Sequence, residues 1–267
     1  MKWWKVTLVV FGAVIITALG IDAADTLTGS NGTLLSQVIQ QSDDDCPSGM
    51  VSVDTVSSLT CVDVYEASPA EDCPQTNPEQ MVSSIRNVEF SNCKVESKSD
   101  STPWRFITRD QAMQMCARSG KRLPTSAEWY ALGLGMSSVE DVCNVSSGEV
   151  LNSGAFPECI SPHGAYDLVG NVWEWVSDDV IDGTYNSVSL PESGYVAQVD
   201  SAGMTVVSDD EPSELFAEDY FWSQKEGAFG IIRGGYYDSG SDGGLYTVHA
   251  DTLPTTASVG IGFRCVK

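Results

Sequence analysis

Two carboxylates that flank a Gly-Asn turn are the side chains of this sequence with the clearest potential for chemistry. Asp167 precedes the turn at Gly170-Asn171, and Glu174 follows it. A carboxylate among apolar neighbours requires a cation, an arginine or N–H donors. Two carboxylates together with free turn carbonyls are ligands that a hard cation such as Ca²⁺ prefers. Residue chemistry thus leaves two alternatives, a Ca²⁺ site or the pairing of Glu174 with a structural arginine.

The stretch around Glu174 has the pattern of a β-strand. Successive side chains of a strand point to opposite faces, so Trp173 and Trp175 share one face and Glu174 lies on the other. We expect the two tryptophans to form a wall of the core.

Two capping boxes predict helices upstream of this strand. In each box a threonine is followed, one helical turn later, by a side chain that can return to the backbone of the cap. The pairs are Thr108 with Gln111 and Thr125 with Glu128, and the first helix is expected to end at Gly120. Glu128 therefore has a capping role rather than a role as ligand or base.

The composition excludes partners that carry many phosphates. Among 267 residues, 14 are Lys or Arg and 37 are Asp or Glu, which gives a formal net charge of −23. Such a chain cannot neutralise a row of phosphates, so nucleic acid is not an expected partner. A long acidic insertion, 183–230, contains Asp209-Asp210-Glu211, which we expect to form a solvated face.

The N-terminus is typical of a targeting segment. Lys2 and Lys5 precede an apolar run that is short for a membrane span and suits a signal peptide. We predict a signal peptide or N-terminal membrane anchor at 1–21, a polar linker at 22–45 and one domain at 46–267. The protein is therefore expected to be secreted or attached to the cell surface, and the sequence leaves open whether the segment is cleaved.

The cysteines are typical of an exported protein. Their number, eight, is even and no Cys-x-x-Cys pair occurs, which favours structural disulfides over zinc or redox chemistry. Spacing alone does not determine the connectivity. Our hypothesis is the set Cys46–Cys61, Cys73–Cys93, Cys143–Cys159 and Cys116–Cys265.

Four ordered motifs give the sequence a specific resemblance to a known family. They are Gly120–Trp129, Gly164–Trp175, Arg233–Gly235 and Gly262–Cys265. In this order they resemble the formylglycine-generating, sulfatase-modifying enzyme family, from about Cys46 to the C-terminus. The resemblance implies an α+β fold of the C-type-lectin-like type, with much irregular structure, and it supports the pairing of Cys116 with Cys265.

The resemblance also gives the metal hypothesis a specific ligand set. In the family, the turn that contains these carboxylates holds Ca²⁺ through two side chains and two backbone carbonyls. Carried over position by position, the ligands are the side chains of Asp167 and Glu174 and the carbonyls of Gly170 and Val172. We therefore expect a structural Ca²⁺, with Asp167 in place of an amide that is common in the family.

The catalytic part of the family pattern is missing. Oxidase members of the family use two cysteines between the Arg-Gly-Gly and Gly-Phe-Arg motifs to bind copper, but no cysteine occurs here between Gly235 and Gly262. Tyr246 or His249 cannot replace a thiolate pair, which is the soft ligand that Cu(I) requires. The sequence has 2 histidines, too few for the three-histidine iron site of sulfoxide-synthase relatives. We therefore expect no catalytic residues.

The stretch 231–266 has the composition of an antibody combining loop. It is rich in Tyr, Ser, Gly and Asp and contains no Lys, Glu, Gln, Met or Trp. The same absence is typical of one branch of the family, the variable proteins diversified by retroelements, in which mutated Asn codons cannot encode those five residues. An ordinary loop region rich in small residues is the alternative. The expected contact residues are Tyr236, Tyr237, Asp238, Ser239, Asp242, Tyr246, His249, Asp251 and Thr252, with the three tyrosines as anchors.

These features predict an exported ligand-binding protein that displays a diversified C-terminal surface on a calcium-stabilised scaffold. The expected partner is a surface ligand, a protein or a glycan, with attachment to the membrane through the N-terminal segment as a further option. Two other functions remain as alternatives. One is an oxidase of the formylglycine-generating type, and the other is a structural envelope protein without catalysis.

Overall fold

The computed structural model describes residues 46–53, 59–136 and 142–267. The chain divides into two compact units, Met1–Asp45 and Cys46–Lys267, of which the second is described below. The predicted N-terminal signal or anchor and the polar linker lie outside the described residues. Within the described ranges no helix has the length and the apolar character needed to cross a bilayer.

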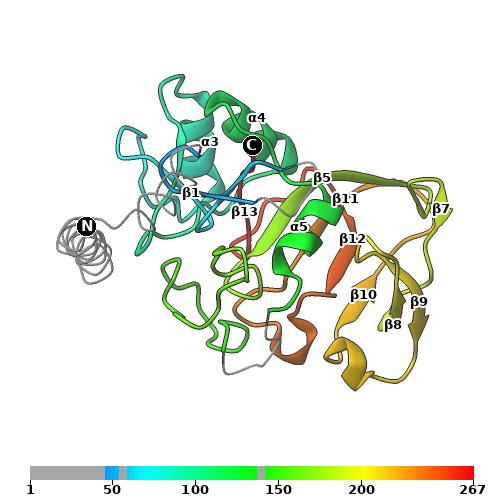
Figure 1. The fold of residues 1–267 in the computed structure, drawn as a ribbon. Coiled ribbons are helices and arrows are strands. Elements are labelled where there is room, and N and C mark those ends of the chain that lie inside the picture. The colour runs from blue at the N-terminus through cyan, green and yellow to red at the C-terminus, as the bar shows by residue number, and fades with distance from the viewer. Residues whose placement is uncertain (1–45, 54–58, 137–141) are drawn as a thin grey trace, which may run out of the picture. The chain divides into compact units, whose positions relative to one another are not determined.

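The core of the second unit is a nine-stranded sheet, in the order β7-β6-β5-β11-β12-β10-β8-β9 with β13 paired to β5 (Figure 1). Most pairs are antiparallel, but β13 runs parallel to β5 and β10 runs parallel to β12. The strands are β5 (Trp173–Ile181), β6 (Thr184–Tyr185), β7 (Val188–Ser189), β8 (Gly194–Val199), β9 (Thr205–Asp209), β10 (Tyr220–Trp222), β11 (Ala228–Arg233), β12 (Val248–Thr252) and β13 (Ile261–Phe263).

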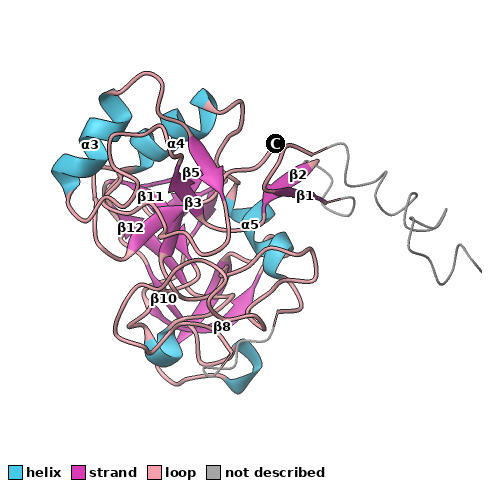
Figure 2. Cartoon of the chain, turned by 90° about the vertical axis from the view of Figure 1, so that its left-hand side faces the viewer, coloured by secondary structure: helices cyan, strands magenta, loops and turns pink. Residues whose placement is uncertain are grey.

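Two small sheets and three helices complete the described part of the unit. Figure 2 shows α3 and α4 at one end of the sheet and β8 and β10 at the other. The elements are β1 (Met50–Ser52) with β2 (Cys61–Asp63), β3 (Ala67–Pro69) with β4 (Val95–Ser97), α3 (Met81–Glu89), α4 (Arg109–Arg118), α5 (Ser126–Gly133) and the short 3-10 turns η1 (Glu214–Phe216) and η2 (Gly240–Asp242).

Both predicted capping boxes form. The Thr108 side chain accepts from the Gln111 backbone N–H at the start of α4, and the Thr125 side chain accepts from the Glu128 N–H at the start of α5. Helix α4 ends just before Gly120, as predicted. Both helices pack against β5, so local capping sets the start of the elements that cover the central strand.

The alternation predicted around Glu174 is confirmed. Trp173 and Trp175 pack in one hydrophobic cluster with Phe263, whereas Val176 belongs to the cluster on the other side of β5. Strand β5 therefore separates two parts of the core, and the two tryptophans form the predicted wall.

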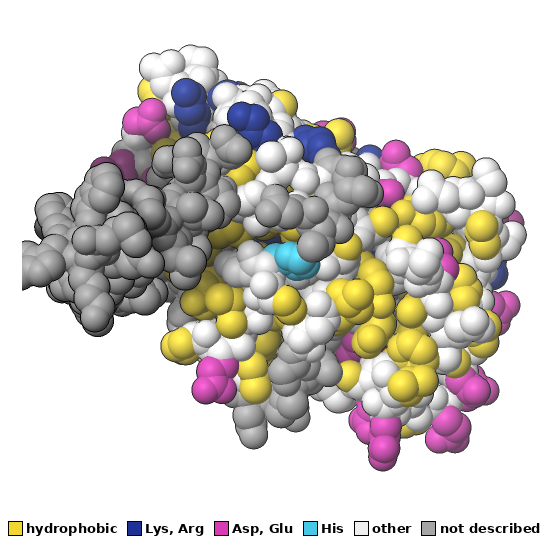
Figure 3. Space-filling view, viewed as in Figure 1, with side chains coloured by type: hydrophobic (Ala, Val, Ile, Leu, Met, Phe, Trp, Pro, Cys, Tyr) yellow, Lys and Arg dark blue, Asp and Glu magenta, His cyan; other side chains and the backbone are white. Residues whose placement is uncertain are grey.

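The acidic insertion is more ordered than a solvated loop. Residues 183–230 form β6 to β10, and Leu190, Val196 and Phe221 from this range lie in the core. The charge run at Asp209-Asp210-Glu211 is exposed, and acidic side chains gather at the edge of the molecule near β8 and β9 (Figure 3). The insertion therefore adds the far edge of the sheet, and its charge run is the solvated face that the sequence predicts.

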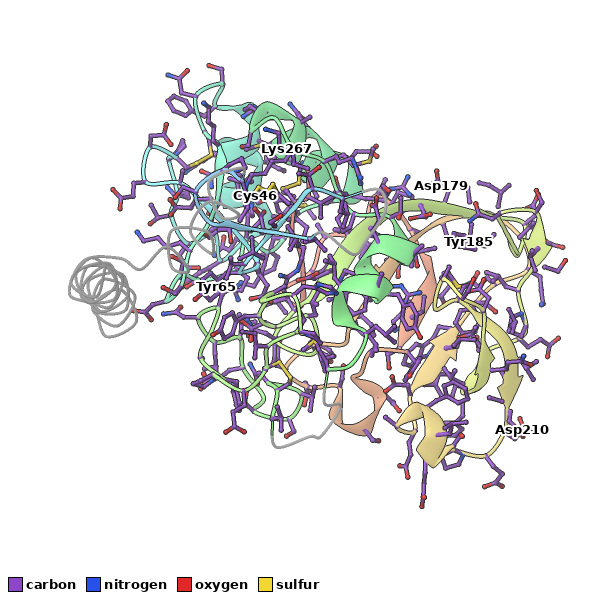
Figure 4. The ribbon with its side chains drawn as sticks, viewed as in Figure 1. Cys46, Tyr65, Asp179, Tyr185, Asp210 and Lys267 are labelled. Carbon is purple, nitrogen blue, oxygen red and sulfur yellow. A yellow bond between two sulfur atoms is a disulfide. The ribbon has the colours of Figure 1, made fainter. Side chains whose placement is uncertain are left out.

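The structure forms four disulfides with the connectivity that we hypothesised (yellow in Figure 4). Three close short loops, and Cys116–Cys265 joins α4 to the segment after β13 across a sequence separation of 149. The fold class predicted from the sequence is confirmed: a mixed α+β unit with much irregular structure, held by disulfides.

Candidate functional site

Glu174 is fully buried in β5 and pairs with an arginine. The Arg264 Nε donates to both Glu174 carboxylate oxygens at 2.8 Å, and the Arg264 Nη2 lies 2.7 Å from Oε1. The Trp129 indole N–H donates to Oε2 at 2.7 Å. Arg264 also donates to the carbonyls of Asp63 and Tyr166. The arginine alternative from the sequence is therefore present, and this pair joins the central strand to the C-terminal segment.

Asp167, the second predicted carboxylate, is buried in the same region. Its Oδ2 accepts from the Gly154 N–H at 2.6 Å. Burial raises the pKa of the Asp167 carboxyl to about 6, although the Gly154 hydrogen bond and the Arg264 charge oppose this rise. The nearby Glu174 charge raises it further.

A third buried carboxylate, Glu66, joins this group. Its Oε2 accepts from the Ser153 hydroxyl and from the Asn171 side-chain amide, each at 2.7 Å. Its Oε1 is buried without a hydrogen-bond partner among the described residues. Burial, followed by the charges of Asp167 and Glu174, raises the pKa of Glu66 well above its ordinary value. We did not identify Glu66 from the sequence, because its partners are 87 and 105 residues away.

Three buried carboxylates thus face one arginine, an excess of acidic oxygens that suits a hard cation. The described part of the chain has no group of three or more His, Cys, Asp and Glu side chains that could hold a metal ion. A site of two carboxylates and two backbone carbonyls is not a group of that kind. The Glu174 carboxylate already has four short contacts with N–H donors of Arg264 and Trp129, which is about the number that a carboxylate can accept. Carboxylate and carbonyl oxygens, the ligand type predicted from the sequence, are the type that Ca²⁺ prefers, and the Glu66 Oε1 is the oxygen of this group that has no hydrogen-bond partner among the described residues.

A pocket of about 500 Å³ lies beside the start of β5, where Trp173 precedes Glu174. Its walls come from the start of β5, the end of β10, β11, β12 and the loops before and after β12. The lining residues are Trp173, Trp222, Ile232, Tyr236, Asp238, Ser239, Asp242, His249, Thr252, Thr256, Ser258, Gly260 and Ile261. The pocket has the size of an ordinary small-ligand site.

Strand register explains why these side chains meet. In the parallel pair of β10 and β12, Trp222 lies beside His249, and their rings stack with centroids 3.9 Å apart. In the antiparallel pair of β11 and β12, Ile232 lies on the other side of His249. In the parallel pair of β5 and β13, Trp173 lies beside Ile261. Five strands, β5 and β10 to β13, therefore supply residues to the pocket lining.

All nine contact residues expected from the sequence are half-buried or exposed. The pocket lining includes Tyr236, Asp238, Ser239, Asp242, His249 and Thr252.

The other three expected contacts lie outside the lining. Tyr237 packs against the Tyr236 ring with centroids 4.8 Å apart. Asp251 lies 3.0 Å from the His249 Nδ1. Tyr246 packs away from the pocket against Tyr130 and Phe216.

Sequence reasoning missed the two tryptophans of the pocket as site residues. Trp173 was assigned to the core, where it lies with 7% exposure, yet it also borders the pocket. Trp222 lies in the acidic insertion, outside the stretch 231–266 from which the contact residues were predicted. The pairing of β10 with β12, which brings Trp222 to His249, has no local signal in the sequence.

The pocket is acidic. Among the described residues its lining contains Asp238 and Asp242 but no lysine or arginine. Burial raises the pKa of the Asp242 carboxyl, and the nearby His249 opposes that rise. Burial and the Asp238 charge raise the pKa of the Tyr236 hydroxyl.

Sequence comparison finds the family that the motifs suggested. Residues 141–267 match the family model described as the Sulfatase-modifying factor enzyme 1-like domain. The formylglycine-generating enzymes of Bos taurus and Mus musculus are each 32% identical to this chain over 102 residues, which cover 28% of this chain and 27% of the relative. The resemblance is thus confirmed for the C-terminal part of the chain, which spans about a quarter of the length of these curated relatives.

Solved structures of variable proteins are similar to this chain at low identity. The Major Tropism Determinant P3c variant has a TM-score of 0.46 and 16% identity, over 83% of this chain and 52% of that chain. Treponema denticola variable protein 1 has a TM-score of 0.39 and 15% identity, over 65% of this chain and 72% of that chain.

Proposed function

We propose that this chain is an exported ligand-binding protein that performs no catalysis. We propose that the C-terminal stretch 231–266 supplies most of its ligand contacts. The observation that carries the proposal is the pocket of about 500 Å³, whose lining includes six of the residues expected to be contacts. Aromatic anchors surrounded by small polar side chains are typical of surfaces that bind by shape and adaptable hydrogen bonds. The proposed partner is a surface protein or glycan.

The cysteines support binding rather than oxidation. Every cysteine of the sequence belongs to one of the four disulfides. A copper oxidase of the formylglycine-generating type needs free thiolates, which this chain does not offer near the pocket. Incubation with Cu(I), oxygen and a cysteine-containing peptide is expected to leave the peptide unchanged, and formation of an aldehyde would favour the oxidase alternative instead.

Arrays of glycans and of cell-surface peptides test the proposal. The purified protein is compared with the variant Tyr236→Ala/His249→Ala, which alters the pocket, and with Asp210→Asn, which alters the exposed charge run (Figure 4). We expect array signals that the pocket variant loses and the Asp210 variant keeps. Identical signals for all three proteins would reject a ligand site at this pocket and favour a structural envelope protein.

Diversification of the stretch 231–266 is a separate part of the proposal. It is supported by the absence of Lys, Glu, Gln, Met and Trp from that stretch. The neighbouring DNA is expected to encode a reverse transcriptase and to contain a near-identical repeat of the stretch in which adenines stand at the variable positions. A neighbourhood without both features would leave a binding protein of fixed sequence.

A structural Ca²⁺ is proposed at the turn that precedes β5. The side chains of Asp167 and Glu174 and the carbonyls of Gly170 and Val172 would hold it, and the buried excess of carboxylates over Arg264 supports the assignment. When bound, the ion would neutralise part of this excess and fix the turn.

Calcium binding is tested by thermal unfolding. For the chelated protein, Ca²⁺ is expected to raise Tm, since an ion that binds only the folded chain stabilises it. Asp167→Ala is expected to abolish the rise, and Asp210→Ala is the matched control. An unchanged Tm of the wild-type protein with added Ca²⁺ would contradict the assignment.

A further inference from the structure

The walls of the pocket provide several aromatic rings in different orientations. The ring planes of Trp173 and Trp222 are inclined by 85°, with centroids 6.3 Å apart. Tyr236 lies nearly parallel to Trp173, with centroids 6.4 Å apart. The His249 ring stacks on Trp222 and meets Trp173 edge-on at 4.9 Å. The rings of this corner therefore meet at several angles, and the His249 ring covers one face of Trp222.

Carboxylates surround this corner. Asp238 and Asp242 line the pocket, and Asp251 lies 3.0 Å from the His249 Nδ1. Within the part of the chain that the structure describes, the lining offers no lysine or arginine to an anion. The net charge of −23 adds a long-range attraction for cations.

Aromatic faces and carboxylates share one preferred ligand. An organic cation is attracted to the face of a Trp or Tyr ring, most strongly where water is excluded. A carboxylate at the same site adds an ion pair. A neutral sugar would use the rings and hydroxyls but gain little from the two aspartates, and an anion would be repelled by them.

We infer that the pocket takes an organic cation, an alkylammonium or quaternary ammonium group, with Trp173, Trp222 and Tyr236 against its carbon atoms and Asp238 and Asp242 against its charge. This assignment rests on the proposed ligand-binding function and names the chemistry of its ligand. The group can come from a small molecule or from a lysine side chain of a partner protein. The volume of about 500 Å³ admits a group of either kind.

Choline and its neutral isostere, 3,3-dimethyl-1-butanol, test the inference. The two compounds have nearly the same shape and differ in charge. Binding to the full protein is followed by calorimetry and by quenching of tryptophan fluorescence, at constant ionic strength and about pH 8, where an ordinary imidazole is neutral. Choline is expected to bind saturably, with an affinity at least about tenfold higher than that of the isostere.

Substitutions assign the binding to this pocket. Asp238→Asn/Asp242→Asn keeps the size of both side chains and is expected to weaken choline binding about tenfold, while Asp210→Asn leaves it unchanged. Trp222→Leu is expected to weaken binding of the cation without a matching loss for the isostere. Unchanged circular dichroism and Tm identify variants that remain folded.

A comparison with lysine derivatives distinguishes the two sources of the cation. N-acetyl-lysine amide and its Nε-trimethyl form are compared with choline, and a peptide that carries one of them is added last. Tighter binding of the peptide than of the free compounds assigns the pocket to a partner protein, and tighter binding of choline assigns it to a small molecule. Either result supports an organic cation.

Two outcomes overturn the inference. One is equal binding of choline and the isostere, and the other is no binding of any cation. If the array signals still depend on Tyr236 and His249 in that case, the pocket binds a ligand of different chemistry and the proposed function stands. If those signals do not depend on the two residues, the proposed function fails as well.

Discussion

Asp219 is a buried carboxylate whose ionisation should make the protein less stable as the pH rises. It precedes β10 with 1% exposure. Its Oδ2 accepts from the Tyr246 N–H at 2.6 Å, and its Oδ1 has no hydrogen-bond partner among the described residues. Burial raises the pKa of Asp219 to about 7, against the lowering effect of hydrogen bonds from Tyr246 and Thr247.

The direction and the size of this pH dependence of stability follow from the linkage between folding and proton binding. The folded chain holds the Asp219 proton up to about pH 7, whereas the unfolded chain releases it near the ordinary value of 3.8. Between these values the folded state binds more protons, so stability is largest at low pH and is lost as the pH rises through the folded pKa. At about 1.4 kcal/mol per pH unit, the difference between the folded and unfolded pKa values corresponds to about 4 kcal/mol of stability. About 2–3 kcal/mol of this stability is lost between pH 5 and pH 8.

Asp219→Asn removes this dependence with little change of shape. The amide oxygen can still accept from the Tyr246 N–H. Urea unfolding at pH 5 and pH 8, in a buffer with chelator, gives the free energy of unfolding of both proteins. The advantage of the Asn variant over the wild type is expected to be about 2–3 kcal/mol larger at pH 8.

The exposed Asp210 provides the control (Figure 4). Asp210→Asn is expected to follow the wild-type profile, because the Asp210 side chain is exposed and its replacement leaves the buried Asp219 carboxyl in place. The reasoning is refuted if Asp219→Asn and wild type differ by the same free energy at both pH values.

Two further predictions concern the frame that carries the sites. Replacing Cys116 and Cys265 by Ser removes a disulfide with a sequence separation of 149. The free energy of unfolding, measured by urea titration, is expected to fall by about 5 kcal/mol. A loss under about 1 kcal/mol would show that the disulfide does not restrict the unfolded chain. Gly234→Ala places a Cβ against the Leu168 carbonyl at a φ of +93°. Its Tm is therefore expected to fall well below that of Gly120→Ala, where the φ is +70° and no atom lies within 4 Å of the new Cβ. Equal values of Tm for the two variants would contradict the predicted clash.

Local patterns in the sequence predicted the parts of the fold whose hydrogen bonds are local. The boxes at Thr108 and Thr125 form because each cap and its partner lie within one helical turn. The alternation around Glu174 predicted which tryptophans share a face, since the side-chain period of a strand is fixed by its backbone. The stretch 231–266 supplied many of the pocket residues.

The sequence by itself thus determined the capped helices, the faces of the central strand, the disulfide chemistry and the composition of the stretch 231–266. Only the tertiary structure decided the partners of the buried charges and the walls of the pocket. Arg264 reaches Glu174 across 90 residues, and Glu66 reaches Asn171 across 105. Trp222 reaches His249 through a parallel strand pair. Such pairings depend on packing and strand register summed over the whole unit, because no short-range hydrogen bond selects one distant partner over another.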